Sequence, residues 1–325
     1  MPWKEAILAL HHVAATPDTV RVGMFDCEFP PVLTVMSGDT VVLETVSGKD
    51  SLLPRPGMGM TVPAALRRVL DADLPGLAPH ILTGPIGIAG AAPGDMLEVG
   101  IDAIELGSDW GYTYIRPLAG TLPDDFPDMV LTHAAVDRDS GTARLPWGMV
   151  LPTAPFFGVM GVAPPPSYGR ISSKEPRLHG GNIDNKELIA GSTLFLPVHV
   201  EGGLFSVGDG HGLQGDGEVS VTALEMCLTG QFTLTLHKGG GPRAPVLRFP
   251  RAETPSHFIS MGFDEDLDQA LRQALREMIA FIGSRTGLSA AHAYQICSLC
   301  VDFRVTQAVN GQKGVHGLLP KSLLA

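Results

Sequence analysis

The sequence predicts a mainly β protein that ends in a small α/β unit. About a fifth of the 325 residues are Gly or Pro (39 and 27), and both residues disfavour helix interiors. Short stretches with strand-like alternation of apolar and polar residues follow one another through the first 260 residues. Near Phe263 this period changes to that of an amphipathic helix.

The strand-like stretches are residues 19–25, 40–46, 95–106, 193–200, 218–225 and 232–237. In 95–106, for example, Leu97, Val99 and Ile101 alternate with polar or small residues. Turn signals such as Pro93-Gly94-Asp95 separate the stretches. Many short strands punctuated by turns are typical of a sandwich, a jelly roll or a barrel, so residues 1–260 are expected to form one β-rich region.

The last part of the chain, residues 261–325, is predicted to be an α/β unit packed on that region. One helical face collects apolar side chains, namely Leu267, Leu271, Ala274, Leu275, Met278 and Ile282. A second helix is expected from the capping residue Ser289 to about Cys300, followed by a strand over 301–309 and the turn pair Asn310-Gly311. The expected order is therefore helix, helix, strand.

Composition excludes several classes of function. The net charge of −11 argues against nucleic acid and anionic membranes as partners. The apolar runs are far shorter than the roughly 20 residues of a membrane helix. The start, Met1-Pro-Trp-Lys-Glu5, has no basic segment followed by an apolar one, and four Cys are too few for a disulfide framework. These features predict a soluble cytoplasmic protein.

Candidate ligands for a metal ion lie between the glycines of residues 156–218. One cluster is His179-Gly-Gly-Asn-Ile-Asp184, and a second is Gly208-Asp-Gly-His-Gly-Leu-Gln-Gly-Asp-Gly-Glu218. The carboxylates and the imidazole of the second cluster suit Zn²⁺ or a similar divalent ion. Ca²⁺ is less suitable, because His is a poor Ca²⁺ ligand and the EF-hand pattern is absent. The alternative is a set of tight turns whose Asp side chains bond to their own backbone.

Other candidates are weaker when taken alone. His80, which precedes a turn-rich segment, is a ligand candidate or else a surface or capping residue. Ser173 and Lys174 form a possible nucleophile pair, but the sequence around them departs from the Ser-Ser-Lys pattern of a signature amidase. Cys297 and Cys300 lie in the second predicted helix and are expected to be structural thiols.

Taken together, these segments resemble the acetamidase/formamidase family. The resemblance extends over residues 10–321 through seven ordered motifs, at residues 80–86, 92–95, 155–161, 179–184, 191–198, 208–218 and 314–321. It implies jelly-roll-like and barrel-like β regions, a divalent metal, most naturally Zn²⁺, and a homo-oligomer, a dimer or larger. It also implies hydrolysis of the carbon–nitrogen bond of a small linear amide, acetamide- or formamide-like, with release of ammonia.

The residue types suggest a role for each candidate. We assign His80, Asp184, Asp209 and His211 as the metal-ligand pool and Glu218 as the general base and acid. Asn182 and Gln214 are expected to donate hydrogen bonds to the developing oxyanion, and Thr83 to orient water or the amide.

Two alternatives remain open. Departures from the family pattern at Ile81, Gly212 and Leu213 leave the substrate undecided, and a lactam is the first alternative. A non-catalytic β module that binds a small ligand is the second. Such a module would have no need of a carboxylate such as Glu218 beside the ligand pool.

Overall fold

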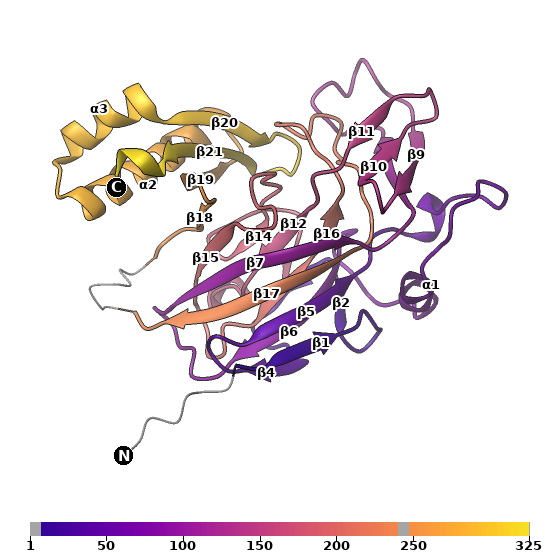
Figure 1. Cartoon of the computed structure of the whole chain (residues 1–325), viewed down its shortest axis with the longest axis horizontal. Helices are drawn as coiled ribbons and strands as arrows, with labels where there is room; N and C mark the ends of the chain where they lie inside the picture. Colours follow the sequence, from indigo (N-terminus) through magenta and orange to yellow (C-terminus); the bar gives the residue numbers. More distant parts are fainter. Residues whose placement is uncertain (1–7, 240–246, 325) are drawn as a thin grey trace.

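The computed structural model describes residues 8–239 and 247–324. Strands hold 38% of the chain and helices 15%, which confirms the predicted mainly β class. Two large sheets form most of the molecule, and the two long helices lie together at one side of it (Figure 1). Residues 1–5, on which the absence of a signal peptide was predicted, lie outside the described residues.

The larger sheet has nine strands and joins the two ends of the chain. Its spatial order is β1 (Leu10–Val13), β5 (Thr40–Thr45), β17 (Leu228–His237), β7 (Met96–Leu106), β15 (Thr193–Pro197), β18 (Arg251–Glu253), β19 (His257–Asp264), β21 (Lys313–Pro320) and β20 (Asp302–Gln307). The pair β1–β5 is parallel, whereas β17 and β7 pair antiparallel from Leu228↔Leu106 to His237↔Met96. These two long strands lie side by side across the middle of the molecule (Figure 1).

The second sheet carries most of the glycine-rich motifs. Its order is β14 (Gly180–Asn182), β12 (Phe156–Gly161), β16 (Phe205–His211), β6 (Ile81–Ile88) and β2 (Val20–Val22), with β4 (Leu33–Val35) also beside β6. Apolar side chains of the two sheets share one buried core: Leu43 and Val99 come from the first, Phe157 and Phe205 from the second. The sheets therefore pack face to face, as in a sandwich.

Smaller elements complete the β-rich region. A four-stranded sheet has the order β11 (Val150–Pro152), β10 (Thr142–Arg144), β9 (Val130–Asp137) and β8 (Trp110–Ile115), and β3 (Met24–Phe25) pairs with β13 (Ile171–Ser172). The short helices are α1 (Ala64–Asp71) and the 3₁₀ turns η1 (Asp50–Leu52), η2 (Pro166–Tyr168) and η3 (Lys321–Leu323). None of the sheets in the described residues closes into a barrel, so the barrel-like part takes the form of open sheets.

The predicted helix, helix, strand order of the C-terminal unit is confirmed. Helix α2 (Leu267–Thr286) begins where the Asp266 side chain accepts hydrogen bonds from two backbone N–H groups, and α3 (Ala290–Cys300) begins at Ser289. The buried face of α2 includes Ala274 and Met278, as the helical period predicts. Strand β19 spans residue 260 and continues the nine-stranded sheet, so the division at that residue stays a prediction.

One predicted strand is wrong. Residues 218–225 form a loop that contains only isolated bridges, such as His211↔Glu225. Glu218 and Val221 have φ values of +45° and +85°, which lie in the left-handed region and cannot belong to a strand. Burial does not alternate along this loop either, because residues 222–225 are all buried. Within the described residues, no helix combines the length and apolar character needed to cross a membrane.

Candidate active site

A cavity of about 250 Å³ lies where distant parts of the chain meet. Strands β8, β14 and β16, the start of β6 and the hairpin between β20 and β21 all line it. The loop that follows β16 adds Glu218, Thr222 and Glu225. The site therefore depends on the whole fold, because its walls come from segments more than 200 residues apart in sequence.

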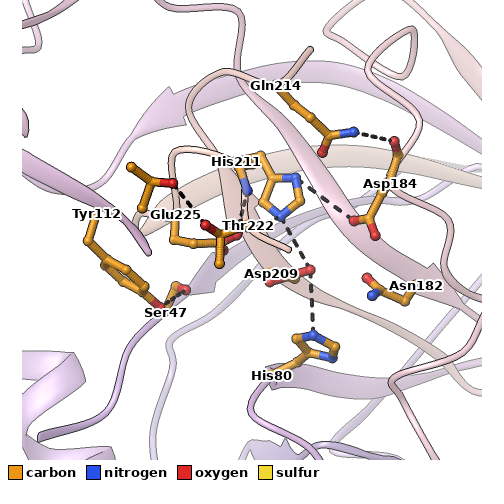
Figure 2. A network of polar contacts seen from close by, with 12 residues as sticks. Ser47, His80, Tyr112, Asn182, Asp184, Asp209, His211, Gln214, Thr222 and Glu225 are labelled. Atoms are coloured by element: carbon orange, nitrogen blue, oxygen red, sulfur yellow. Dashed lines mark hydrogen bonds and ion pairs between the residues drawn. The ribbon is translucent and has the colours of Figure 1, made fainter. Parts of the chain in front are cut away.

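The four predicted metal ligands form one continuous chain of contacts (Figure 2). Nε2 of His80 lies 3.9 Å from Oδ2 of Asp209, and the same oxygen lies 3.4 Å from Nε2 of His211. On its other side, Nδ1 of His211 lies 3.9 Å from Oδ1 of Asp184. Three far-apart sequence motifs thus meet in one cluster. His80 lies at its edge, outside the two groups of side chains whose ligand atoms come within 4.8 Å of one another.

Gly158 on β12 makes room for these side chains. A Cβ atom at this position would lie 2.6 Å from Oδ2 of Asp209 and 2.8 Å from Cε1 of His211, and closer still to Oδ1 of Asp184. No ordinary side chain can be accommodated at such distances. Gly158 therefore leaves open a space that a small ion could share with three surrounding side chains.

The backbone around the site is held in uncommon conformations. Asp184, Asp209 and Glu218 have φ values of +50°, +59° and +45°, all in the left-handed region. Such residues cost of order 1–3 kcal/mol each and tend to persist where a site requires them. The Gln214 side chain donates to the Asp184 carbonyl at 2.9 Å, and the Asn310 side chain donates to Oδ2 of Asp184. Asp184 is therefore held at its backbone carbonyl by Gln214 and at its carboxylate by Asn310.

Burial and mutual repulsion set the protonation of the acids. Burial raises the pKa of Glu218 well above its usual range, and the charge of Asp184 adds to this shift. Burial also raises the pKa of Asp184 and that of Glu225. For Asp209 the opposite holds: His80 and His211 outweigh burial and lower the pKa of this carboxyl.

The neighbouring acids shift the pKa of the central imidazole, His211, in favour of its charged form. Burial would lower the pKa of His211, but Glu225 and Asp209 outweigh it and raise that pKa well above its usual range. Glu225 lies 3.3 Å from Nε2 of His211. Without another cation, the His211 proton thus balances part of the negative charge in the cavity.

The same side chains fit a divalent cation. Asp184, His211 and Glu218 each offer one ligand atom within 4.8 Å of the others, and so do Asp209, His211 and Glu225. Oδ1 of Asp184, Nδ1 of His211 and Oε2 of Glu218 are buried without a hydrogen-bond partner. Buried polar atoms are normally satisfied, and carboxylate oxygens with imidazole nitrogens are common metal ligands.

Comparison with known proteins supplies the family. The sequence profile of the Acetamidase/Formamidase family matches residues 15–171 and 169–322, nearly the whole chain. The chain belongs to this family. It is 30% identical to the formamidase of Methylophilus methylotrophus over 298 residues, covering 70% of this chain and 72% of that protein. It is 31% identical to the acetamidase of Mycolicibacterium smegmatis over 305 residues, covering 70% and 74%.

Solved structures agree with this assignment. The crystal structure of an acetamidase from Bacillus halodurans superposes with a TM-score of 0.81 at 29% identity, covering 96% of this chain and 98% of that one. A γ-lactamase from Delftia acidovorans shares the fold at 23% identity, with a TM-score of 0.63 over 94% of this chain and 89% of that one. The protein is therefore an amidase, a hydrolase of amide carbon–nitrogen bonds.

The remaining predicted residues lie at different distances from the amidase cavity. Asn182 lines it and donates from Nδ2 to the Lys174 carbonyl at 3.2 Å. Gln214 lies behind it and holds the Asp184 carbonyl (Figure 2). The Thr83 hydroxyl donates to the Glu44 carbonyl at 2.7 Å and is not part of the cavity wall. Asp216 of the ligand-rich motif pairs instead with Lys186 at 3.0 Å.

Sequence reasoning missed several residues of the amidase site. Glu225 reaches His211 through an isolated backbone bridge, and Asn310 arrives from a hairpin near the C-terminus. Ser173, considered above as a nucleophile, lies with its Oγ 2.8 Å from Nδ1 of His80 and so holds that ring. Of these residues, only Ser173 was considered for a chemical role, whereas Glu225 and Asn310 were predicted only as parts of a strand and of a turn.

Proposed function

We propose that this amidase hydrolyses a small linear amide to a carboxylic acid and ammonia and that it depends on a bound divalent metal, Zn²⁺. The observation that carries the proposal is the chain of contacts from His80 through Asp209 and His211 to Asp184. Within it, Oδ1 of Asp184 and Nδ1 of His211 are buried without a hydrogen-bond partner. The two imidazoles favour Zn²⁺ over Ca²⁺. Glu218 and Glu225 lie close enough to join the same set.

When bound, the ion would lower the pKa of a water molecule towards 7 and polarise the amide carbonyl. Within this site, Glu218 accepts the proton of the attacking water and delivers it to the leaving nitrogen. The oxygen of that water bonds to the acyl carbon, the carbon–nitrogen bond breaks, and ammonia leaves. The raised pKa of Glu218 suits a group that must first accept a proton and then release it.

Asn182 is the better of the two proposed oxyanion donors. Its amide uses one N–H for the Lys174 carbonyl and retains a second for the cavity that it lines. The Gln214 amide is already engaged behind Asp184, which supports a positioning role. The oxyanion role first assigned to Gln214 and the orienting role first assigned to Thr83 stay predictions. The cavity gives them no support, because neither side chain lines it.

Metal removal tests the proposal. Dialysis against a chelator is expected to abolish ammonia release from acetamide and formamide while circular dichroism stays unchanged, and Zn²⁺ is expected to restore the activity. Metal content is measured on the same samples. Full activity in protein shown to be free of metal would contradict the proposed mechanism and leave the family assignment intact.

A lactam is the second candidate substrate. The cavity of about 250 Å³ has room for a small ring, since one water in the liquid occupies about 30 Å³. Adding lactams to the amide panel separates the two candidates by their relative rates. The non-catalytic binding module is set aside, because the chain is an amidase.

We also propose that the protein forms a homo-oligomer, as the resemblance implies. Several large apolar side chains near the four-stranded sheet are at least 44% exposed: Leu118, Leu122, Phe126, Met129, Val130, Trp147, Met149 and Val150. A surface of this kind supports an interface between copies. Sedimentation velocity measures the assembly state, and a monomer at micromolar concentration would contradict the proposal. The cytoplasmic location remains a prediction.

A further inference from the structure

The cavity of the amidase carries opposite charges at its floor and at its rim. Its acidic residues, Asp209, Glu218 and Glu225, are all buried. Its basic residues other than histidine, Lys49, Arg116 and Lys174, are all exposed. They come from three separate segments: the turn before η1, the end of β8 and the loop after β13. The folded chain therefore collects three cations at one opening.

These three cations have no acidic partner. None of them forms an ion pair within the described residues, whereas Arg67, Lys186 and Arg304 pair with neighbouring acids. The chain as a whole has a net charge of −11, so a cluster of unpaired cations stands out against its surroundings. A cleft lined by one sign of charge concentrates ligands of the opposite sign.

Apolar and aromatic side chains line the same cavity. They are Leu52, Val221 and Val309 together with the rings of Tyr112 and Tyr114. The two tyrosine rings are stacked, with centroids 6.2 Å apart and planes 7° apart. A ligand that reached both zones would thus pass a short apolar segment along these walls.

The size of the cavity exceeds the needs of the smallest amides. At about 250 Å³ it holds several times the roughly 30 Å³ that a water molecule occupies in the liquid. Formamide and acetamide carry no charged group that the rim cations could bind. The cavity matches a longer molecule with a polar group at each end.

We propose that the substrate is an amide whose far end carries a carboxylate, such as the monoamide of a short dicarboxylic acid. The amide group lies among the buried acids and imidazoles, the short carbon chain passes the tyrosines, and Lys49, Arg116 and Lys174 bind the carboxylate. Water cleaves the amide bond to give ammonia and the dicarboxylate. This inference rests on the proposed hydrolysis of small amides and names its substrate class.

The metal-loaded protein is tested with three amides of similar length and different charge: succinamate, neutral butyramide and cationic β-alaninamide. We expect kcat/KM for succinamate to exceed that for butyramide by about tenfold or more, with β-alaninamide the poorest, and the preference to weaken as salt is added. Replacing all three rim cations (Lys49→Met, Arg116→Met and Lys174→Met) should bring the ratio of succinamate to butyramide close to one.

A matched triple variant controls for net charge. Arg138→Met, Arg272→Met and Arg276→Met together remove the same charge from exposed positions outside this cavity and should keep the preference. Equal kcat/KM for succinamate and butyramide, or a preference that survives loss of the rim cations, would overturn the inference.

A binding measurement separates this inference from the proposed function. Calorimetric titration of the metal-loaded protein should show succinate binding about tenfold more tightly than butyrate, and the rim variant should lose that difference. If no amide in the panel is hydrolysed, the proposed function fails and the titration alone decides the anion site. Tighter binding of succinate then supports the site, and equal affinities overturn it.

Discussion

At the scale of single residues, the site depends on the absence of a side chain at Gly158. Gly158→Ala places a Cβ among Asp184, Asp209 and His211, at distances that none of them can accept without moving. Overpacking of this kind costs about 1–3 kcal/mol. We expect the variant to fold, to bind less than a tenth of the metal that the parent protein binds at limiting supply, and to lose activity in proportion. Metal analysis and ammonia release measure both effects.

Gly215→Ala is the matched control for that variant. It lies in the same glycine-rich motif, but a Cβ there meets no atom within 4 Å, and its φ is not left-handed. This variant should keep its metal and its activity. Equal losses in both variants would show that the motif tolerates no substitution and that the space beside Gly158 has no special role.

A second prediction concerns the proton carrier. Glu218→Gln keeps the size of the side chain and removes its basicity, so turnover should fall by about 10² or more. The remaining ligand pool should hold the metal, so metal content is expected to stay near that of the parent protein. Turnover close to the parent value would move the base role to Asp184 or Glu225, the other acids whose pKa values burial raises.

The sequence pointed to the candidate ligand pool more directly than to the residues around it. Asp184, Asp209 and His211 could be singled out because local glycines signal an unusual backbone, and both acids do have left-handed φ values. Glu225 and Gly158 carry no local signal. They matter only because β12 and β16 pair, which brings residue 158 beside residue 209, and because His211 bridges to Glu225.

At the scale of helices and strands too, features with a local sequence signal were predictable and features that depend on distant contacts were not. Helices α2 and α3 were predictable because amphipathic spacing and the caps Asp266 and Ser289 are local. Residues 218–225 alternate like a strand yet form a loop, since their polar side chains face the cavity and the backbone turns at Glu218 and Val221. The alternation of apolar and polar residues alone could not distinguish this loop from a true strand.

The hairpin between β20 and β21 is the element that closes the site. The buried Gln307 side chain accepts hydrogen bonds from the N–H groups of Val309 and Asn310 and donates to the Gln312 carbonyl at 2.7 Å. This brace presents the Asn310 side chain to Asp184. The end of β20 also bonds to the loop that carries Glu218, through the Thr306 carbonyl and the Gly217 N–H at 3.1 Å.

Asn310→Ala should therefore impair the site without unfolding the protein. A hydrogen bond to a charged group contributes about 1.5–3 kcal/mol, so we expect metal affinity or kcat to fall by at least about tenfold, with KM little changed. Metal titration and steady-state kinetics measure this. Gln312→Ala, which leaves the backbone brace in place, is the control. Equal kinetics in the two variants would remove Asn310 from the positioning role.

At the scale of the whole molecule, the nine-stranded sheet joins the C-terminal unit to the β-rich region. Strands β19, β21 and β20 extend the sheet from β18 (Figure 1). The hairpin between β20 and β21 adds Val309 and Asn310 to the wall of the cavity. The sequence predicted both regions but not this connection, because strand order depends on pairings between distant segments. Any loss of the C-terminal strands should thus affect catalysis as well as stability.

Global stability should also depend on a histidine of this shared sheet. His316 on β21 is fully buried; its Nδ1 lies 2.7 Å from the Thr306 hydroxyl, and its Nε2 has no partner. Burial lowers the pKa of His316 to about 4. Between that value and the ordinary pKa of about 6.5, the unfolded chain binds a proton that the folded chain does not, so the free energy of unfolding falls as pH falls.

The expected loss from this one group is about 3 kcal/mol between pH 6.5 and 4. His316→Gln retains a partner for Thr306 and cannot take up the proton, so its free energy of unfolding should fall less steeply over the same interval. Urea denaturation of both proteins, followed with chelator present so that metal release plays no part, measures the two slopes. His179, whose pKa burial lowers to about 3, contributes the same acid loss to both proteins and cancels in the comparison. Identical slopes would mean that His316 binds its proton in the folded protein as readily as in the unfolded chain, and would contradict the prediction.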